Sequence, residues 1–251
     1  MEAADATLIF LHIPKTGGTS LRATMRAAIG RRPTLRLKNH DLSPLLSIAP
    51  EARADLAMVE GHMLYGVHEH IGRRCRYITV LREPVSRLRS WHRYVMTTPH
   101  HRFHSLVEGE RLSLSACIER GLSTELDNHM TRTLGAVCRA ETPFGALTTE
   151  MFEAACRNLE RIEFVGTTER MGEFHAHLCA GLGWEAVPVG HLNRTAGPED
   201  AARGGVAGDR AVEGNEGTER KVREINGFDR ALWERAGAIL ERRLRSAAGV
   251  G

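Results

Sequence analysis

The sequence lacks a long hydrophobic run. No stretch approaches the roughly 18 or more uninterrupted apolar residues of a membrane-spanning helix, so we expect no transmembrane segment. We also expect no secretory signal peptide, because the first apolar strand begins by Thr7 and leaves no room for a leader. These two expectations together predict a cytoplasmic protein.

Paired cysteines and an excess of one charge are missing as well. The five cysteines are odd in number, widely scattered and without a C-x-x-C pair, so neither a disulfide framework nor a zinc site is indicated. The 34 Lys and Arg residues are nearly matched by 31 Asp and Glu residues, for a net charge of +3. This balance argues against a dedicated nucleic-acid binder, yet it is compatible with a local basic pocket for an anionic ligand.

What is present is enough apolar sequence for one sizeable core. The 251 residues are 42% hydrophobic, and short apolar runs alternate with stretches of helical periodicity. This pattern predicts a single α/β domain over 1–251, a P-loop-like three-layer fold with a central, mostly parallel sheet flanked by helices. The segment 197–217 is rich in Gly, Ala and charge, and we expect a mobile loop or lid there. Strands are expected over 8–13, 56–62, 76–81 and 163–169, and helices over 21–29, 85–95, 112–120, 126–134, 149–159, 171–182, 218–225 and 228–244.

The strongest local signal follows the first of these strands. The apolar run breaks at Pro14 into Lys15, two glycines and hydroxyl side chains, and a helix follows. Gly17 and Gly18 let backbone N–H groups approach a ligand closely, and the helix N-terminus adds unpaired donors and partial positive charge. The pattern predicts a loop for a phosphate-like anion. In the usual nucleoside-triphosphate loop the lysine comes after the glycines, whereas here it precedes them.

A second anion site and a proton acceptor are predicted at two further strand ends. Arg82 ends the strand over 76–81, and Ser86, Ser90 and Arg93 or Tyr94 fall on one face of the next helix. An arginine fork and a serine hydroxyl suit a phosphate dianion. Period-two geometry puts Glu60 and His62 on the same side of an extended strand, where either could accept a proton.

Three strings resemble motifs of sulfotransferases that use 3′-phosphoadenosine 5′-phosphosulfate (PAPS). The string P-K-T-G-G-T-S over 14–20 is similar to their 5′-phosphosulfate loop. The string L-R-E-P-V-S-R-L-R-S over 81–90 is similar to their 3′-phosphate motif, L-R-D/E-P-x-x-R-x-x-S. The string G-H-M-L-Y-G over 61–66 resembles the G-H-x-x-Y/F-G stretch of the carbohydrate-type branch. The resemblance extends over nearly the whole chain, apart from 31–55 and 97–123.

The resemblance implies a sulfotransferase that uses PAPS, releases 3′-phosphoadenosine 5′-phosphate (PAP) and requires no metal. It makes His62 the general base and Lys15 the group that neutralises charge on the departing phosphate. The cofactor contacts that it implies are Lys15, Thr16, Gly17, Gly18, Thr19, Ser20, Arg82, Ser90, Arg194 and Thr195. Weaker candidates for contact with the acceptor are Glu60, Asn128 and Arg132; helix capping or ion pairing explains the last two equally well.

Two other functions stay open at this point. A P-loop nucleotide kinase or triphosphatase would share the strand, loop and helix, with Glu60 as the acid that holds magnesium. A noncatalytic nucleotide-binding protein would keep the pocket without turnover. The acceptor is a hydroxyl of a carbohydrate, a glycolipid or another small molecule, and the sequence does not choose between them. Nor does it predict an oligomeric state.

Overall fold

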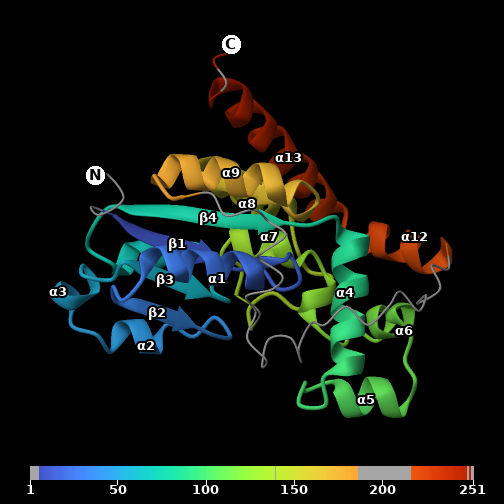
Figure 1. Cartoon of the computed structure of the whole chain (residues 1–251). Coiled ribbons are helices and arrows are strands. Elements are labelled where there is room, and N and C mark those ends of the chain that lie inside the picture. Colours follow the sequence, from blue (N-terminus) through green and yellow to red (C-terminus); the bar gives the residue numbers. More distant parts are fainter. Residues whose placement is uncertain (1–5, 139, 186–215, 248, 250–251) are drawn as a thin grey trace.

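The computed structural model describes residues 6–138, 140–185, 216–247 and 249. Its centre is a five-stranded parallel sheet in the order β2-β3-β1-β4-β5 (Figure 1). The strands are β1 (Thr7–Leu11), β2 (Thr34–Leu37), β3 (Met58–Gly61), β4 (Cys75–Leu81) and β5 (Phe164–Thr167). The expected α/β architecture is confirmed, and the basic stretch after the first helix supplies the edge strand β2.

Helices and single turns join these strands. The α-helices are α1 (Gly18–Ile29), α2 (Ser43–Leu46), α3 (Pro50–Arg53), α4 (Pro84–Thr97), α5 (His104–Gly109), α6 (Leu114–Glu119), α7 (His129–Leu134), α8 (Thr149–Arg161), α9 (Met171–Leu182), α12 (Glu216–Ile225) and α13 (Gly227–Ala247). The 3-10 turns are η2 (Val67–His70), η3 (Thr124–Leu126) and η4 (Thr168–Arg170). No helix among the described residues is long and apolar enough to cross a membrane.

The sheet is covered on both faces, which explains why its strands are continuous apolar runs. Alternate residues of β1 enter two different cores: Leu8 and Phe10 pack with α1 and α9, whereas Ile9 and Leu11 pack with α7 and α8. Figure 1 shows α1 in front of the sheet and α7 behind it. This three-layer packing fixes the strands so that their carboxyl ends, and the loops that follow them, lie at one edge.

The helix α4 continues beyond this edge and carries a third core with α5, α6 and α12. The acid of Glu83 accepts hydrogen bonds from the backbone N–H groups of Val85 and Ser86, and Pro84 occupies the first turn. Such a cap fixes where the helix begins and how it leaves β4. Because Arg82 lies directly before the cap, the same contacts set its position.

One expected helix and one expected loop differ from the structure. The stretch expected as one helix over 126–134 is a 3-10 turn followed by α7, because Asn128 adopts a left-handed conformation with φ 44° and interrupts it. The segment expected as a loop up to residue 217 already forms helix α12 from Glu216. Residues 197–215 of that segment lie outside the described residues.

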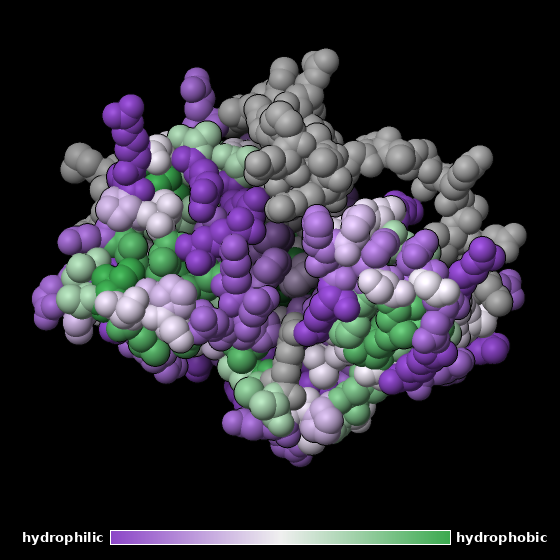
Figure 2. All heavy atoms as spheres, turned by 90° about the horizontal axis from the view of Figure 1, so that it is seen from below, coloured by the Kyte–Doolittle hydropathy of each residue, from purple (hydrophilic) through white to green (hydrophobic). Residues whose placement is uncertain are grey.

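The face seen from below in Figure 2 is mixed in character. Hydrophilic side chains form a band between areas with more hydrophobic residues. Among the described residues, the large hydrophobic side chains classed as exposed are Leu46 and Leu106, which belong to α2 and α5. The described part of this face therefore alternates between polar and apolar areas.

Candidate anion and transfer site

The loop after β1 has the backbone of a helix-terminal anion site. Gly17 has φ 79° and forms the N-cap of α1, and Lys15 has φ 70°, which is uncommon for a residue with a side chain. No side-chain hydrogen bond caps this end of α1, and the first turn of a helix carries backbone N–H groups that have no partner within the helix. The loop therefore presents donors and the positive end of the helix dipole at one point.

Hydrogen bonds from three side chains hold the backbone of this loop in place. The Thr168 hydroxyl, just after β5, donates to the carbonyl oxygen of Thr16 at 2.8 Å. The guanidinium Nη1 of Arg82 donates to the carbonyl oxygen of Lys15 at 3.1 Å. The Thr16 hydroxyl donates to the Ile13 carbonyl at 2.9 Å, and Thr16 is buried. In this structure, then, the Thr16 hydroxyl holds the loop in shape, and its expected contact with the cofactor stays a prediction.

Lys15, Arg82 and Arg93 form a cluster of positive charge beside the loop. Burial, followed by repulsion from Arg82 and then from Arg93, lowers the pKa of Lys15 to about 8. Burial also lowers the pKa of Arg82; the charges of Glu169 and Glu83 oppose this shift, and Arg93 adds to it. Lys15 and Arg82 are half-buried and Arg93 is exposed, and an anion bound beside such neighbouring cations stabilises their charged forms. The two predicted anion motifs thus converge on one site.

The face of α4 that was expected to contact the ligand does turn toward the loop. The ammonium Nζ of Lys15 lies 4.2 Å from the centre of the Tyr94 ring. Ser90 is one turn earlier on the same face and is partly exposed. Ser90 and Arg82 are therefore on the elements that flank the loop, as the 3′-phosphate motif requires.

Gly18 allows a close approach between α1 and the end of β1. A Cβ on Gly18 would lie 2.3 Å from Cδ2 of the His12 ring, a distance that real side chains do not reach. The His12 ring in turn lies 4.8 Å from the ring of His62, centre to centre. The glycine thus lets a pair of histidine rings lie against the first turn of the helix.

The hydrogen bond of His62 fixes which of its ring nitrogens can accept a proton. Its Nδ1 lies 2.8 Å from the carbonyl oxygen of His12, and because a carbonyl only accepts, Nδ1 carries the proton. The lone pair of the neutral ring is then on Nε2. Burial lowers the pKa of His62, opposed by the bond to His12 and by the charge of Glu125. The ring is consequently neutral near pH 7 and can accept a proton.

Glu60, expected as a weak substrate contact or magnesium ligand, lies inside the fold instead. Its carboxylate is fully buried and pairs with Arg26, whose Nη2 is 2.6 Å from Oε1. The Nε of Arg22 lies 3.8 Å from Oε2. Glu60 therefore anchors α1 to β3 in this structure, and these contacts favour a structural role over contact with a substrate or magnesium.

Asn128 and Arg132 also have structural partners. The Asn128 side chain bonds to the backbone of Ile225 and of Asp229. Arg132 is 1% exposed and bonds to the Asp127 carboxylate and, at 2.6 Å, to the Thr142 carbonyl. These contacts favour the capping and ion-pairing roles over contact with an acceptor. The remaining expected residues, Arg194 and Thr195, lie outside the described residues.

Glu125 is a site residue that the sequence did not indicate. Its carboxylate accepts a hydrogen bond from the Trp91 indole at 2.9 Å, and its backbone carbonyl accepts one from Arg87 at 2.6 Å. Burial lowers the pKa values of His62 and His101, and the negative charge of Glu125 opposes both shifts. No motif surrounds it, because only the packing of η3 on α4 brings it to the site.

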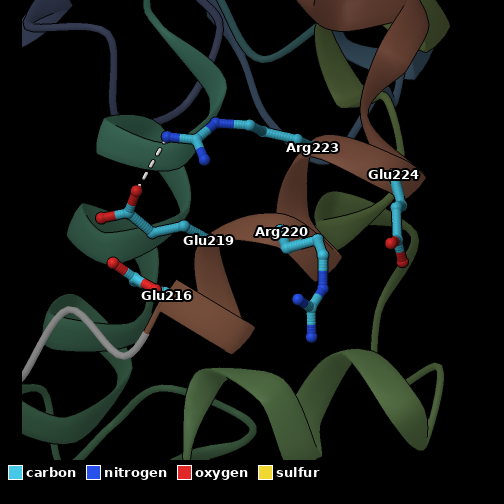
Figure 3. Close-up of a pocket in the computed structure, with 5 residues that line it drawn as sticks. All are labelled: Glu216, Glu219, Arg220, Arg223 and Glu224. Atoms are coloured by element: carbon cyan, nitrogen blue, oxygen red, sulfur yellow. Dashed lines mark hydrogen bonds and ion pairs between the residues drawn. The ribbon is translucent and has the colours of Figure 1, made fainter.

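A hollow of about 660 Å³ beside α12 does not have the character of a ligand site. Figure 3 shows that one helix supplies its lining and that Arg223 is paired with Glu219. The lining residues are Glu216, Glu219, Arg220, Arg223 and Glu224. All five are charged, whereas small-molecule sites are lined mainly by apolar groups with a few placed polar ones. The loop after β1 remains the candidate site.

No family model matches this chain, and no curated protein matches it.

Proposed function

We propose that this protein is a PAPS-dependent sulfotransferase that moves a sulfuryl group to a hydroxyl of a carbohydrate, glycolipid or other small molecule. The observation that carries the proposal is the hydrogen bond from Arg82 to the backbone of Lys15, 67 residues away in sequence. It brings the two motifs that resemble the 5′- and 3′-phosphate sites to one edge of the sheet. PAPS carries anionic groups at both of these positions.

The residues present fit such a nucleotide. The first backbone N–H groups of α1, with the hydroxyls of Thr19 and Ser20 on its first turn, would hold the 5′-phosphosulfate. Arg82 and Ser90 would hold the 3′-phosphate, and the lowered pKa of Lys15 supports an anion among the three cations. We also propose that the protein acts in the cytoplasm on a small acceptor rather than on nucleic acid, in keeping with its balanced charge.

The transfer would be a single in-line displacement. The acceptor oxygen forms a bond to sulfur while the bond from sulfur to the bridging phosphate oxygen breaks, and PAP leaves with that electron pair. Nε2 of His62 takes the proton of the acceptor hydroxyl. The Lys15 ammonium neutralises the charge that develops on the bridging oxygen. Most of the rate would come from positioning and fixed charge, by analogy with phosphoryl transfer.

The burial of Glu60 argues against a nucleotide kinase or triphosphatase. That function needs an acid at a strand end to hold magnesium. Glu60 is the acid that the sequence offered, and its carboxylate is enclosed with Arg26 and Arg22. A noncatalytic nucleotide-binding protein would instead keep the charge cluster and need no base.

The experiment is a screen for transfer of labelled sulfate from PAPS to a panel of sugars, glycolipids and small alcohols, with PAP release measured in parallel. We expect His62→Ala to lower turnover by about 10²–10⁴-fold, the usual contribution of a general base, while PAP still binds. His100→Ala, an exposed histidine beyond α4, is the matched control and should keep full activity. Full activity in His62→Ala would show that the base is misassigned. Tight PAP binding without any acceptor turnover would favour the noncatalytic function.

A further inference from the structure

Tyr94 occupies a special place beside the anion loop. It lies on α4, and its ring faces the Lys15 ammonium with Nζ 4.2 Å from the ring centre. The edge of the Tyr94 ring also contacts His101, with 5.5 Å between ring centres. No hydrogen bond of the Tyr94 hydroxyl occurs within the described residues, so the face of the ring is what this residue offers to its surroundings.

Burial, and then the charges of Arg82 and Arg93, disfavour the cationic form of Lys15. Arg82 and Arg93 approach Lys15 from the end of β4 and from α4. The titratable rings of His12 and His101 interact with it from the end of β1 and from the segment after α4. An aromatic face is attracted to a cation through its quadrupole without contributing a negative charge that would repel a phosphate. A carboxylate in the same place would compete with the ligand.

The backbone of Lys15 adds to this requirement. Its φ of 70° is held by the bonds of the loop, including the one from Arg82 to its carbonyl oxygen. The backbone therefore fixes where the side chain starts, and the Tyr94 ring fixes where its ammonium ends. Because both ends of the Lys15 side chain are held, few of its rotamers remain accessible. Electrostatic catalysis needs a charge that is positioned in this way before the substrate binds.

We propose that Tyr94 is a positioning residue that acts through Lys15: the face of its ring holds the ammonium charged and in place beside the anion loop. The proposal rests on the function above insofar as Lys15 is taken to stabilise the leaving phosphate. The contact itself is a property of the protein without nucleotide. It can therefore be tested whether or not an acceptor is found.

The test is an NMR titration of the chain labelled with ¹³C at the lysine ε-carbon. The sequence has three lysines, Lys15, Lys38 and Lys221, so the spectrum is simple and the last two serve as internal controls. In the unsubstituted protein we expect the Lys15 signal to be shifted upfield by the ring and to titrate near pH 8. Tyr94→Phe keeps the ring face and should leave both properties as they are.

Tyr94→Leu removes the ring face and should abolish the upfield shift. We expect the Lys15 titration to move down by about one pH unit, as a half-buried cation–π contact implies. With an active acceptor assay, kcat near pH 7.5 should fall in Tyr94→Leu and be restored in Tyr94→Phe. Should Tyr94→Leu not fold, Tyr94→Gln is measured in the same way.

An unchanged Lys15 signal and titration in the folded Leu or Gln variant would overturn the proposal. A shifted titration together with a complete lack of PAP binding in the unsubstituted protein would keep the Tyr94 contact and reject the proposed function. A purely structural role for Tyr94 would lower the stability of the Leu variant and would leave the Lys15 titration unchanged. The outcomes for the contact and for the function are therefore separable.

Discussion

The guanidinium group of Arg82 donates a hydrogen bond of 3.1 Å to the backbone carbonyl oxygen of Lys15. The two residues lie in the segments that follow the neighbouring parallel strands β1 and β4, and each belongs to a different predicted anion motif. Arg82 uses its Nη1 for this bond, which holds the loop in place. The other guanidinium nitrogens would donate to a ligand. One arginine thus links the shape of the loop to the second anion position.

Replacing this arginine tests the link. We expect Arg82→Ala to weaken PAP binding by about 10–100-fold, since a hydrogen bond to a charged group contributes about 1.5–3 kcal/mol. Arg89→Ala is the control, because Arg89 lies on the helix α4 that follows Arg82 and pairs with Glu219. Isothermal titration calorimetry measures both affinities. Equal affinities for PAP in the Arg82 and Arg89 variants would remove Arg82 from the 3′-phosphate site.

The lowered pKa of Lys15 predicts a pH dependence of nucleotide binding. The free protein holds Lys15 as a cation below about pH 8 and loses that charge as the pH rises through this value. Bound phosphate favours the cation, so binding takes up a proton at pH values above 8. PAP affinity should therefore be nearly constant from pH 7 to 7.5 and fall between pH 8 and 9.5. Lys15→Arg should flatten this fall; a wild-type affinity independent of pH would contradict the assignment.

Gly18 provides a steric prediction. In Gly18→Ala the new methyl group would meet the His12 ring at 2.3 Å, so either α1 or the pair of rings formed by His12 and His62 must move. We expect the variant to lose most of its PAP affinity. Gly237→Ala is the control: it lies within α13 with nothing within 4 Å of the new Cβ, and it should stabilise the helix slightly. Thermal unfolding and PAP titration of the two variants give the comparison.

Arg132 separates a structural role from a substrate role. Arg132→Met removes the ion-pair partner of the buried Asp127 carboxylate and the bond to the Thr142 carbonyl. Breaking one side of a buried pair typically costs about 3–5 kcal/mol, so the unfolding temperature should fall sharply. Folded molecules of the variant should bind PAP with unchanged affinity. A loss of acceptor turnover without a loss of stability would instead restore the acceptor contact.

Much of the fold was predictable because its signals are local. The helix over 171–182 has the bounds expected from the sequence, and buried parallel strands appear as short apolar runs. A helix end that depends on the backbone torsion of a single residue was harder to predict. The left-handed φ of Asn128 divides a stretch that has helical periodicity throughout. Strand ends also differed by a few residues, as at β1, which ends at Leu11.

The candidate site was predictable only where a motif carries its own geometry. The loop with Lys15 and the helix with Ser90 follow from glycine, lysine and serine spacing. The burial of Glu60 could not be predicted. The alternation of side chains along a strand predicts which face of the sheet a residue lies on, but not which arginine pairs with it. The approach of Glu125 to His62 depends on how a 3-10 turn packs against α4, and no sequence pattern encodes that contact.

The central claim is that the protein binds a nucleotide through two separate phosphates, at the 5′ and 3′ positions. The most direct measurement is a calorimetric comparison of PAP with adenosine 5′-phosphate, which lacks the 3′-phosphate, with and without magnesium. The account predicts that PAP binds at least about tenfold more tightly, as one charge-assisted phosphate contact implies, and that magnesium makes no difference. Equal affinity for the two nucleotides, or binding that requires magnesium, would contradict it.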